Sequence, residues 1–260
     1  MPRFVLAAPV VLIAIFVACV TTPVTNRQAL NLVSDAQMNQ LGLQAWHEVI
    51  AKEKISRDPR LSEIVSRVGR RIAAASGQNY DWEFVVIDSP KTVNAFCLPG
   101  GKIAVYTGIL PVAQNEAALA AVLGHEVAHA TARHGAERMS QGLVAQFGMQ
   151  VVDQAMKDSK YRGLAVGALG VGAQFGVLLP YSRLHEAEAD KIGLLYMAKA
   201  GYDPVEAPAL WLRMAGTGQR VPEFISTHPD PLKRAEQLEK SIPDVLPAWS
   251  ASERQPTRAI

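Results

Sequence analysis

The sequence predicts an α+β domain that is mostly helical and carries one small β-sheet. Two helices are expected over residues 34–57 and 59–76, because each stretch opens on a residue that favours helix starts. A strand is expected over residues 80–88, which are rich in aromatic and β-branched side chains. Residues 94–108 read as two strands joined by a Pro-Gly-Gly turn.

The helices continue after this hairpin. Asn115 is a favourable N-cap for an Ala-rich apolar run over residues 117–124, and residues 136–160 are expected to continue helically. A small sheet beside several helices is the arrangement of an α+β fold.

The segment His125-Glu126-Val127-Ala128-His129 lies within this apolar helix. Residues four apart share one helix face, so both imidazoles can reach one metal ion while Glu126 points to where a bound water would lie. This is the zinc-protease arrangement of two ligands and a general base. The alternative is a helix carrying two solvated histidines. The apolar flanks argue against it, because buried polar groups need partners.

A catalytic zinc needs a third protein ligand. His134 follows on the same predicted helix, but at about 100° per residue it lies about 140° around from His129. We therefore interpret His134 as a histidine at the helix C-terminus, followed by the stop signal Gly135.

A better source of the ligand is Glu186 or Asp190, which are four apart on a second predicted helix. One carboxylate can bind zinc while the other accepts a hydrogen bond from a ligand histidine. The pattern His-Glu-x-x-His followed by Ser-Arg-x-x-Glu-x-x-Ala-Asp resembles the M48 metallopeptidases. These are gluzincins that include Oma1-like and bacterial periplasmic lipoprotein proteases.

The resemblance implies a mostly helical gluzincin domain over residues 34–242 with a small β-sheet beside the active-site helix. It makes the zinc ligands His125, His129 and Glu186. It makes Glu126 the base and Asp190 a support for a ligand. Two neighbours, His185 and Glu188, are expected on a solvated helix face.

In gluzincins a strand before the active-site helix offers an open edge to an extended peptide, which binds by main-chain hydrogen bonds. The resemblance assigns this function to the strand residues Lys102, Ile103, Ala104, Val105 and Tyr106. An ordinary hairpin strand is the plainer interpretation and does not conflict with it.

Residues 226–234 resemble the late Thr-His-Pro motif of the family, with a following arginine. His228 is then expected near the zinc, where it stabilises the oxyanion or fills the fourth position and holds the enzyme latent. Arg234 is expected to neutralise developing charge or to orient nearby carboxylates. Alone, His-Pro is more often a turn before a helix, with Asp230 as N-cap.

The N-terminus predicts export. Residues 1–18 have a charged start and an apolar stretch, as in a signal peptide, and Val17-Ala18-Cys19 resembles a lipobox. Cys19 is the expected lipidation site, although Phe16 departs from the usual leucine; an uncleaved anchor or an ordinary signal peptide is the alternative. Residues 19–33 are expected to be a lipidated polar tether.

The remaining expectations concern a glycine-rich segment, the C-terminal residues and Cys97. Residues 163–180 are apolar and glycine-rich, and are expected to be a mobile or interfacial cover of the site; a membrane span is the alternative. Residues 243–260 are expected to be a disordered tail. Cys97 is expected to be a small core residue. Because the chain has only two cysteines, no disulfide can form within it if Cys19 carries lipid.

The formal charge of +2 is spread along the chain, which gives no sign of a nucleic-acid partner. We therefore expect a zinc-dependent endopeptidase in the periplasm, held at a membrane by an N-terminal lipid, that cleaves misfolded or unassembled envelope proteins. One alternative is a chaperone-like assembly factor with a latent or structural zinc site. A secreted digestive protease without lipid is another.

Overall fold

The computed structural model describes residues 19–164, 166–167, 179–216, 228 and 230–260, with backbone alone for residues 179–182. The predicted signal peptide, most of the apolar segment 163–180 and residues 226, 227 and 229 of the motif around His228 lie outside the described residues. The named elements follow in chain order: β1 (Cys19–Thr21), β2 (Gln28–Leu30), α2 (Asp35–Lys52), α3 (Pro59–Ser76), β3 (Glu83–Ile87), β4 (Ala95–Leu98), β5 (Lys102–Tyr106), η1 (Thr107–Ile109), α4 (Leu110–Ala113), α5 (Glu116–Thr131), α6 (His134–Ala155), α8 (Leu179–Lys199), α9 (Glu206–Gly216) and α11 (Pro231–Ala251).

The mostly helical α+β fold is confirmed, and the early helices begin where their capping residues predict. Ser34 forms a capping box at the start of α2, and Asp58 accepts hydrogen bonds from the first turn of α3. The Asn115 side chain caps α5 by accepting from the amide of Ala118. The first helix is shorter than expected and ends at Lys52.

The predicted hairpin is also present, within a three-stranded sheet of order β3-β5-β4. Its turn places Gly100 and Gly101 at φ of 85° and 88°, a region that glycine adopts without steric cost. β5 pairs antiparallel with β4 and parallel with β3. β5 is therefore the central strand.

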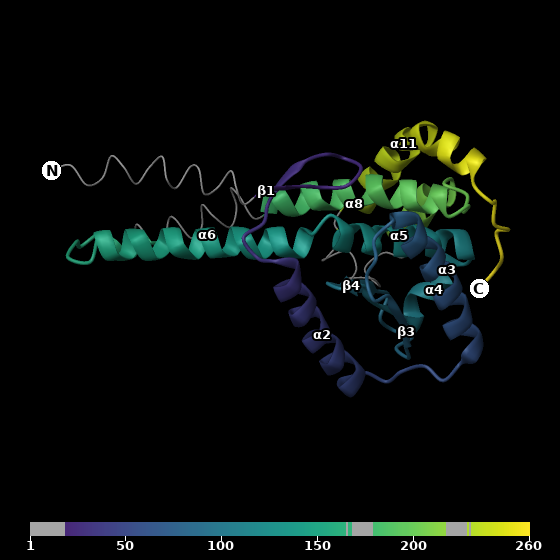
Figure 1. Cartoon of the computed structure of the whole chain (residues 1–260), viewed down its shortest axis with the longest axis horizontal. Helices are drawn as coiled ribbons and strands as arrows, with labels where there is room; N and C mark the ends of the chain where they lie inside the picture. Colours follow the sequence, from purple (N-terminus) through teal and green to yellow (C-terminus); the bar gives the residue numbers. More distant parts are fainter. Residues whose placement is uncertain (1–18, 165, 168–178, 217–227, 229) are drawn as a thin grey trace.

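Helix α5 lies within the globular part of the molecule, in contact with α3, α8, α9 and β4 (Figure 1). Its alanines let neighbouring helices approach closely, and the closest approach is to α8. A Cβ on Gly193 of α8 would lie 2.7 Å from backbone atoms of Gly124 and His125. The two glycines thus allow the backbones of α5 and α8 to touch next to His125.

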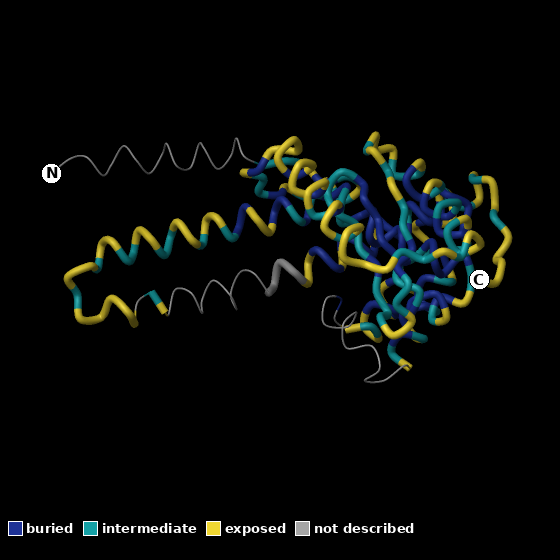
Figure 2. The backbone as a smooth tube through the Cα atoms, turned by 90° about the horizontal axis from the view of Figure 1, so that it is seen from below, coloured by how far each residue is buried: buried dark blue, intermediate teal, exposed yellow. Residues whose placement is uncertain are grey.

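Helix α6 begins only three residues after α5 ends and extends away from the core, where its outer part is largely solvent-exposed (Figure 2). The boundary lies at Arg133, whose backbone is left-handed with φ of 60°. His134 is consequently the first residue of α6. The expected histidine at a helix C-terminus before a Gly135 stop is wrong.

The C-terminal residues are ordered, so the predicted disordered tail from Pro243 is wrong. Helix α11 continues through Pro243 to Ala251. Beyond it, the amide of Ile260 donates to the carbonyl of Gln114, 3.1 Å away, beside the start of α5. Backbone hydrogen bonds to the core outweigh the polar composition that suggested disorder.

The segment after Cys19 is likewise folded, which corrects the expectation of a free polar tether. β1 and β2 form an antiparallel pair, and Ala29 is buried. The amide of Leu32 donates to Ser140 of α6 at 2.9 Å. Within the described residues, no helix combines the length and hydropathy that a membrane span requires.

Candidate metal centre

Two histidines one turn apart on α5 form the base of the site. The Nε2 atoms of His125 and His129 are 3.0 Å apart, so both lone pairs face the same point. Glu126 lies between them in sequence and is buried. The helix thus arranges its side chains as the spacing predicts.

Helix α8 brings a carboxylate to this point. Glu186 lies 3.3 Å from His125 Nε2 through Oε2, and 3.3 Å from His129 Nε2 through Oε1. The close crossing of α5 and α8 at their glycines makes this convergence possible.

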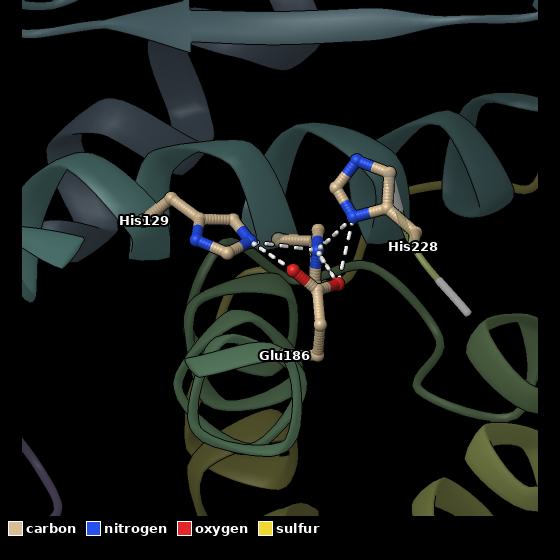
Figure 3. A group of neighbouring side chains, drawn as sticks. His129, Glu186 and His228 are labelled. Carbon is tan, nitrogen blue, oxygen red and sulfur yellow. Dashed lines mark hydrogen bonds and ion pairs between the residues drawn. The ribbon is translucent and has the colours of Figure 1, made fainter. Parts of the chain in front are cut away.

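His228 completes the group (Figure 3). Its Nδ1 lies 2.7 Å from Glu186 Oε2 and 3.2 Å from His125 Nε2. One ligand atom from each of four residues lies within 4.8 Å of the others: His125, His129, Glu186 and His228. This donor set of three imidazoles and one carboxylate is a metal-binding cluster of the kind that zinc prefers.

Asp190 and Arg234 lie behind the cluster. The Nη2 and Nε atoms of Arg234 donate to the two oxygens of Asp190 at 2.5 and 2.7 Å, and its Nη1 donates to Glu186 at 3.1 Å. The guanidinium also stacks on Trp211, 3.5 Å from the ring centroid. Asp190 Oδ1 lies 3.1 Å from His125 Nδ1, where it accepts the proton of that nitrogen and orients the ring.

The electrostatics of the cluster favour a cation. Burial works to raise the pKa of Glu186, but hydrogen bonds from the three histidines hold it well below its usual range. Burial and Arg234 work to lower the pKa of His125, yet hydrogen bonds with Asp190 and Glu186 raise it to about 9. Burial lowers the pKa of His129 well below its usual range. The ionised Glu186 and the neutral His129 suit a metal ion, and His125 releases a proton when a metal replaces its hydrogen bond to Glu186.

Glu126 differs from the other acidic groups of the site. Burial raises its pKa, and among the described residues nothing donates a hydrogen bond to its buried Oε1. His228 Nε2 is 3.7 Å from this atom, outside hydrogen-bond distance. A buried oxygen without a donor fits a water molecule held against it.

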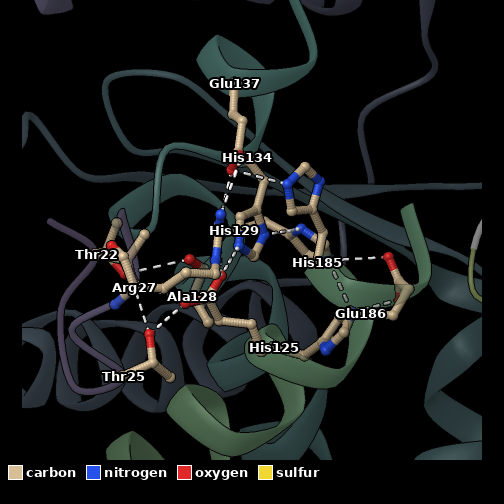
Figure 4. A network of polar contacts seen from close by, with 12 residues as sticks. Thr22, Thr25, Arg27, His125, Ala128, His129, His134, Glu137, His185 and Glu186 are labelled. Carbon is tan, nitrogen blue, oxygen red and sulfur yellow. Dashed lines mark hydrogen bonds and ion pairs between the residues drawn. The ribbon is translucent and has the colours of Figure 1, made fainter. Parts of the chain in front are cut away.

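A second polar network, which the sequence did not reveal, lies on the other side of His129 (Figure 4). Its buried members include His134, Glu137, His185 and Glu188. The expectation that His185 and Glu188 are solvated is wrong, because Arg27 from the N-terminal segment covers this face with hydrogen bonds to Glu137 and Glu188. The only sequence signal was the density of histidines and acidic residues itself.

The predicted substrate strand must also be corrected. Residues 102–106 form the central strand β5, paired on both sides, and Lys102 to Val105 are buried. β3 and β4 are the two edge strands of this sheet, and the outer edge of β3 is bridged at Ile87 by Ile55. Within the described residues no strand pairs with the outer edge of β4. A cavity of about 170 Å³ lies between the end of β4 and the site, lined by Leu98, His129 and Arg133 among others.

Neither Cys19 nor Cys97 forms a disulfide within the part of the chain that the structure describes. Cys97, on β4, is partly buried and packs against the main core, where burial raises its thiol pKa well above the usual value. Cys19 lies at the start of β1 and is partly exposed.

Comparison with known proteins places this geometry in a family. Peptidase family M48 matches residues 56–242. The mitochondrial metalloendopeptidase OMA1 of Schizosaccharomyces pombe is 39% identical over 236 residues, which cover 85% of this chain and 66% of the relative. The human mitochondrial metalloendopeptidase OMA1 is 33% identical over 242 residues, covering 86% of this chain and 46% of the relative.

A bacterial relative is similar at a comparable level. The beta-barrel assembly-enhancing protease of Yersinia pestis is 29% identical over 206 residues, covering 75% of this chain and 42% of the relative. The chain thus spans between 42% and 66% of the length of these three proteins. With its four-residue cluster and the match over residues 56–242, the chain belongs to peptidase family M48.

Proposed function

We propose that this protein is a zinc-dependent endopeptidase. The observation that carries the proposal is the convergence of His125, His129 and Glu186 within reach of one ion, with Glu126 beside them. A purely structural site has no need of that additional buried carboxylate. Three histidines and one carboxylate suit zinc better than the oxygen-preferring magnesium or calcium.

The chain's own residues then share the chemistry. When bound, zinc polarises the scissile carbonyl and lowers the pKa of water. Glu126 accepts the proton of the attacking water and passes it to the leaving amine, and its raised pKa suits both steps. Asp190 orients His125, and Arg234 holds Asp190 and Glu186 in place.

The substrate is proposed to lie along the free edge of β4, rather than along β5. An extended peptide added to Ala95–Leu98 would bind through main-chain hydrogen bonds, which give affinity with little sequence preference. The cavity between Leu98 and His129 then receives a side chain next to the reacting bond. Unfolded segments, which expose their backbone, fit such a groove.

His228 decides whether the resting enzyme is active. Its Nδ1 lies among the ligand atoms, which favours the latent form in which it fills the fourth position. On displacement from the metal, the same side chain is near enough to stabilise the oxyanion. A closed four-ligand site is typical of structural zinc. This observation also keeps a chaperone-like assembly factor with a latent or structural zinc as the second candidate function.

The proposed substrates are misfolded or unassembled proteins of a bacterial cell envelope. The apolar run before Cys19 supports a lipid anchor and a periplasmic location. The bacterial relative's name, a beta-barrel assembly-enhancing protease, supports the same setting, whereas the OMA1 relatives are mitochondrial. Mass spectrometry of the mature N-terminus tests the anchor, since a diacylglyceryl group on Cys19 is expected.

Cleavage of reduced, unfolded casein tests the enzyme assignment. Glu126→Gln is expected to lower kcat by roughly 10²–10⁴-fold while the protein keeps one zinc per chain, because the base is lost but the ligands stay. Glu63→Gln, on the exposed face of α3, is the matched control and should retain full activity. Equal cleavage by wild type and Glu126→Gln would refute the proposal.

A further inference from the structure

The second nitrogen of His129 has a partner that the proposed mechanism does not use. His129 Nε2 faces Glu186, while its Nδ1 lies 2.8 Å from Nδ1 of His134. A histidine that offers the Nε2 lone pair to a metal carries its proton on Nδ1. With the metal bound, His129 therefore donates from Nδ1 to His134, whose own proton must then be on Nε2.

That proton points to Glu188. The Nε2 of His134 is 3.1 Å from Glu188 Oε2, and both side chains are buried. The hydrogen bonds from His129 to His134 and from His134 to Glu188 thus run in one consistent direction. Such imidazole and carboxylate partners fix the orientation and tautomer of a ligand histidine.

Glu188 is held by the segment that precedes α2. Its Oε1 accepts hydrogen bonds from the hydroxyls of Thr22, at 2.8 Å, and Thr25. Its Oε2 accepts from Nε of Arg27 at 2.8 Å. Every one of these neighbours donates to Glu188, whose two oxygens therefore act as acceptors for Thr22, Thr25, Arg27 and His134 alike.

Arg27 also fixes the other face of His134. Its Nη1 and Nη2 donate to the two oxygens of Glu137 at 2.9 and 2.7 Å. Glu137 in turn accepts from Nε2 of His185 at 2.9 Å, and the His185 ring stacks on that of His134 with centroids 4.3 Å apart. One guanidinium thus binds two buried carboxylates, each of which contacts one of the two stacked rings.

We propose that His134 is a positioning residue for the metal ligand His129, and that residues 19–30 complete the metal site by holding Glu188 and Glu137 through Thr22, Thr25 and Arg27. The inference rests on the proposed function only in taking His129 as a zinc ligand. Because the segment starts at Cys19, metal affinity depends on the part of the chain that leads to the proposed anchor.

The test is the zinc dissociation constant, measured by competition with a chromophoric chelator. All variants are made in the Glu126→Gln background, so the result does not depend on proteolysis. Arg27→Met and His134→Phe are each expected to raise Kd by roughly 10–100-fold. Gln28→Ala, whose exposed side chain binds only Thr21 among the described residues, is the matched control and should leave Kd unchanged.

The double variant Arg27→Met/His134→Phe distinguishes positioning from a general loss of structure. If both residues act through one path, the double variant binds zinc about as weakly as the weaker single variant. The inference would be overturned if the fold increases in Kd of the two single variants multiply in the double variant, or if either single variant leaves Kd unchanged.

Two further variants cover the possibility that Arg27→Met does not fold. Thr22→Val/Thr25→Val removes two hydroxyl donors from Glu188 and keeps Arg27, and it should still weaken zinc binding. His134→Gln, whose amide can both accept from His129 and donate to Glu188, should restore most of the affinity lost in His134→Phe. Absence of casein cleavage by the protein with Glu126 intact would refute the proposed function alone, whereas absence of this coupling pattern beside normal cleavage would refute the positioning role alone.

Discussion

The two helix histidines of the metal centre are supported in different ways. Asp190, a carboxylate on α8 that Arg234 holds, orients the ring of His125. His129 instead contacts a second histidine, His134, which in turn contacts Glu188, a carboxylate held by the N-terminal segment. The first support is direct and lies within the core. The second passes through two more residues and ends at Arg27, whose side chain is 19% exposed. His125 is therefore held by contacts within the core, whereas the position of His129 depends on the N-terminal segment that carries Arg27.

The largest effect is expected from Asp190→Asn, which breaks the direct support. It leaves the buried guanidinium of Arg234 with less compensation, and it replaces one of the two oxygens that accept from Arg234 and His125 with an NH2 group, which can only donate. We expect a loss of about 3 kcal/mol in the free energy of unfolding and roughly 100-fold weaker zinc binding, measured by urea denaturation and chelator competition.

Asp153→Asn is the control for this variant, since it removes an acidic partner from the exposed ion pair with Arg162. The free energy of unfolding and the zinc affinity of Asp153→Asn should both stay near the wild-type values. Wild-type affinity in Asp190→Asn would show that His125 needs no such support.

The second largest effect is expected at the place where α8 crosses α5 beside His125. In Gly193→Ala the new methyl group meets the backbone of Gly124 and His125, so α8 must shift. We expect a loss of about 1–3 kcal/mol in stability, measured by thermal unfolding, together with weaker zinc binding. Gly142→Ala, on α6 with open space at the same position, should be neutral or stabilising.

The two carboxylates that bind Arg27 allow the contact with His134 to be tested separately from the packing of the network. Both Glu137 and Glu188 bind Arg27, but only Glu188 contacts His134. Glu188→Gln is therefore expected to weaken zinc binding by roughly 10-fold, and Glu137→Gln to change it less. Equal losses in chelator competition would mean that the network acts only through its overall packing.

The smallest effect is a pH dependence of stability. Burial works to raise the pKa of Glu137, but hydrogen bonds from His185 and Arg27 lower it to about 2. Since an unfolded glutamate titrates near about 4.3, this stabilisation is present above that pH and is lost as the pH falls toward 2. In urea denaturation of zinc-free protein, the stability advantage of wild type over Glu137→Gln should be about 1 kcal/mol smaller at pH 3.5 than at pH 6. The same difference in stability between the two proteins at both pH values would contradict the lowered pKa of Glu137.

The sequence predicted what depends on local spacing. The helix pairs His125/His129 and Glu186/Asp190 follow from the helical repeat, and the Pro-Gly-Gly turn specified the hairpin. The resemblance supplied Glu186 as the partner of the histidines and brought in His228. These features require only a few residues, or a family pattern, to be recognised.

What was missed depends on long-range packing. Arg27 reaches carboxylates that are 110 and 161 positions away in the chain, so no local pattern shows that Glu137 and Glu188 are buried. The central place of β5 results from its parallel pairing with β3, which periodicity does not specify. The helix through Pro243 likewise follows from packing of α11 against α8 and α9.

X-ray absorption at the zinc edge tests the central claim most directly, namely that the two α5 histidines and Glu186 bind zinc while His228 closes the fourth position. For the zinc-loaded wild type, the account predicts three imidazole nitrogens and one carboxylate oxygen at about 2.0–2.2 Å. His228→Ala should show two imidazoles with zinc still bound. Two imidazoles in both proteins would contradict the closed site, and a sulfur ligand at about 2.3 Å would contradict the ligand set itself.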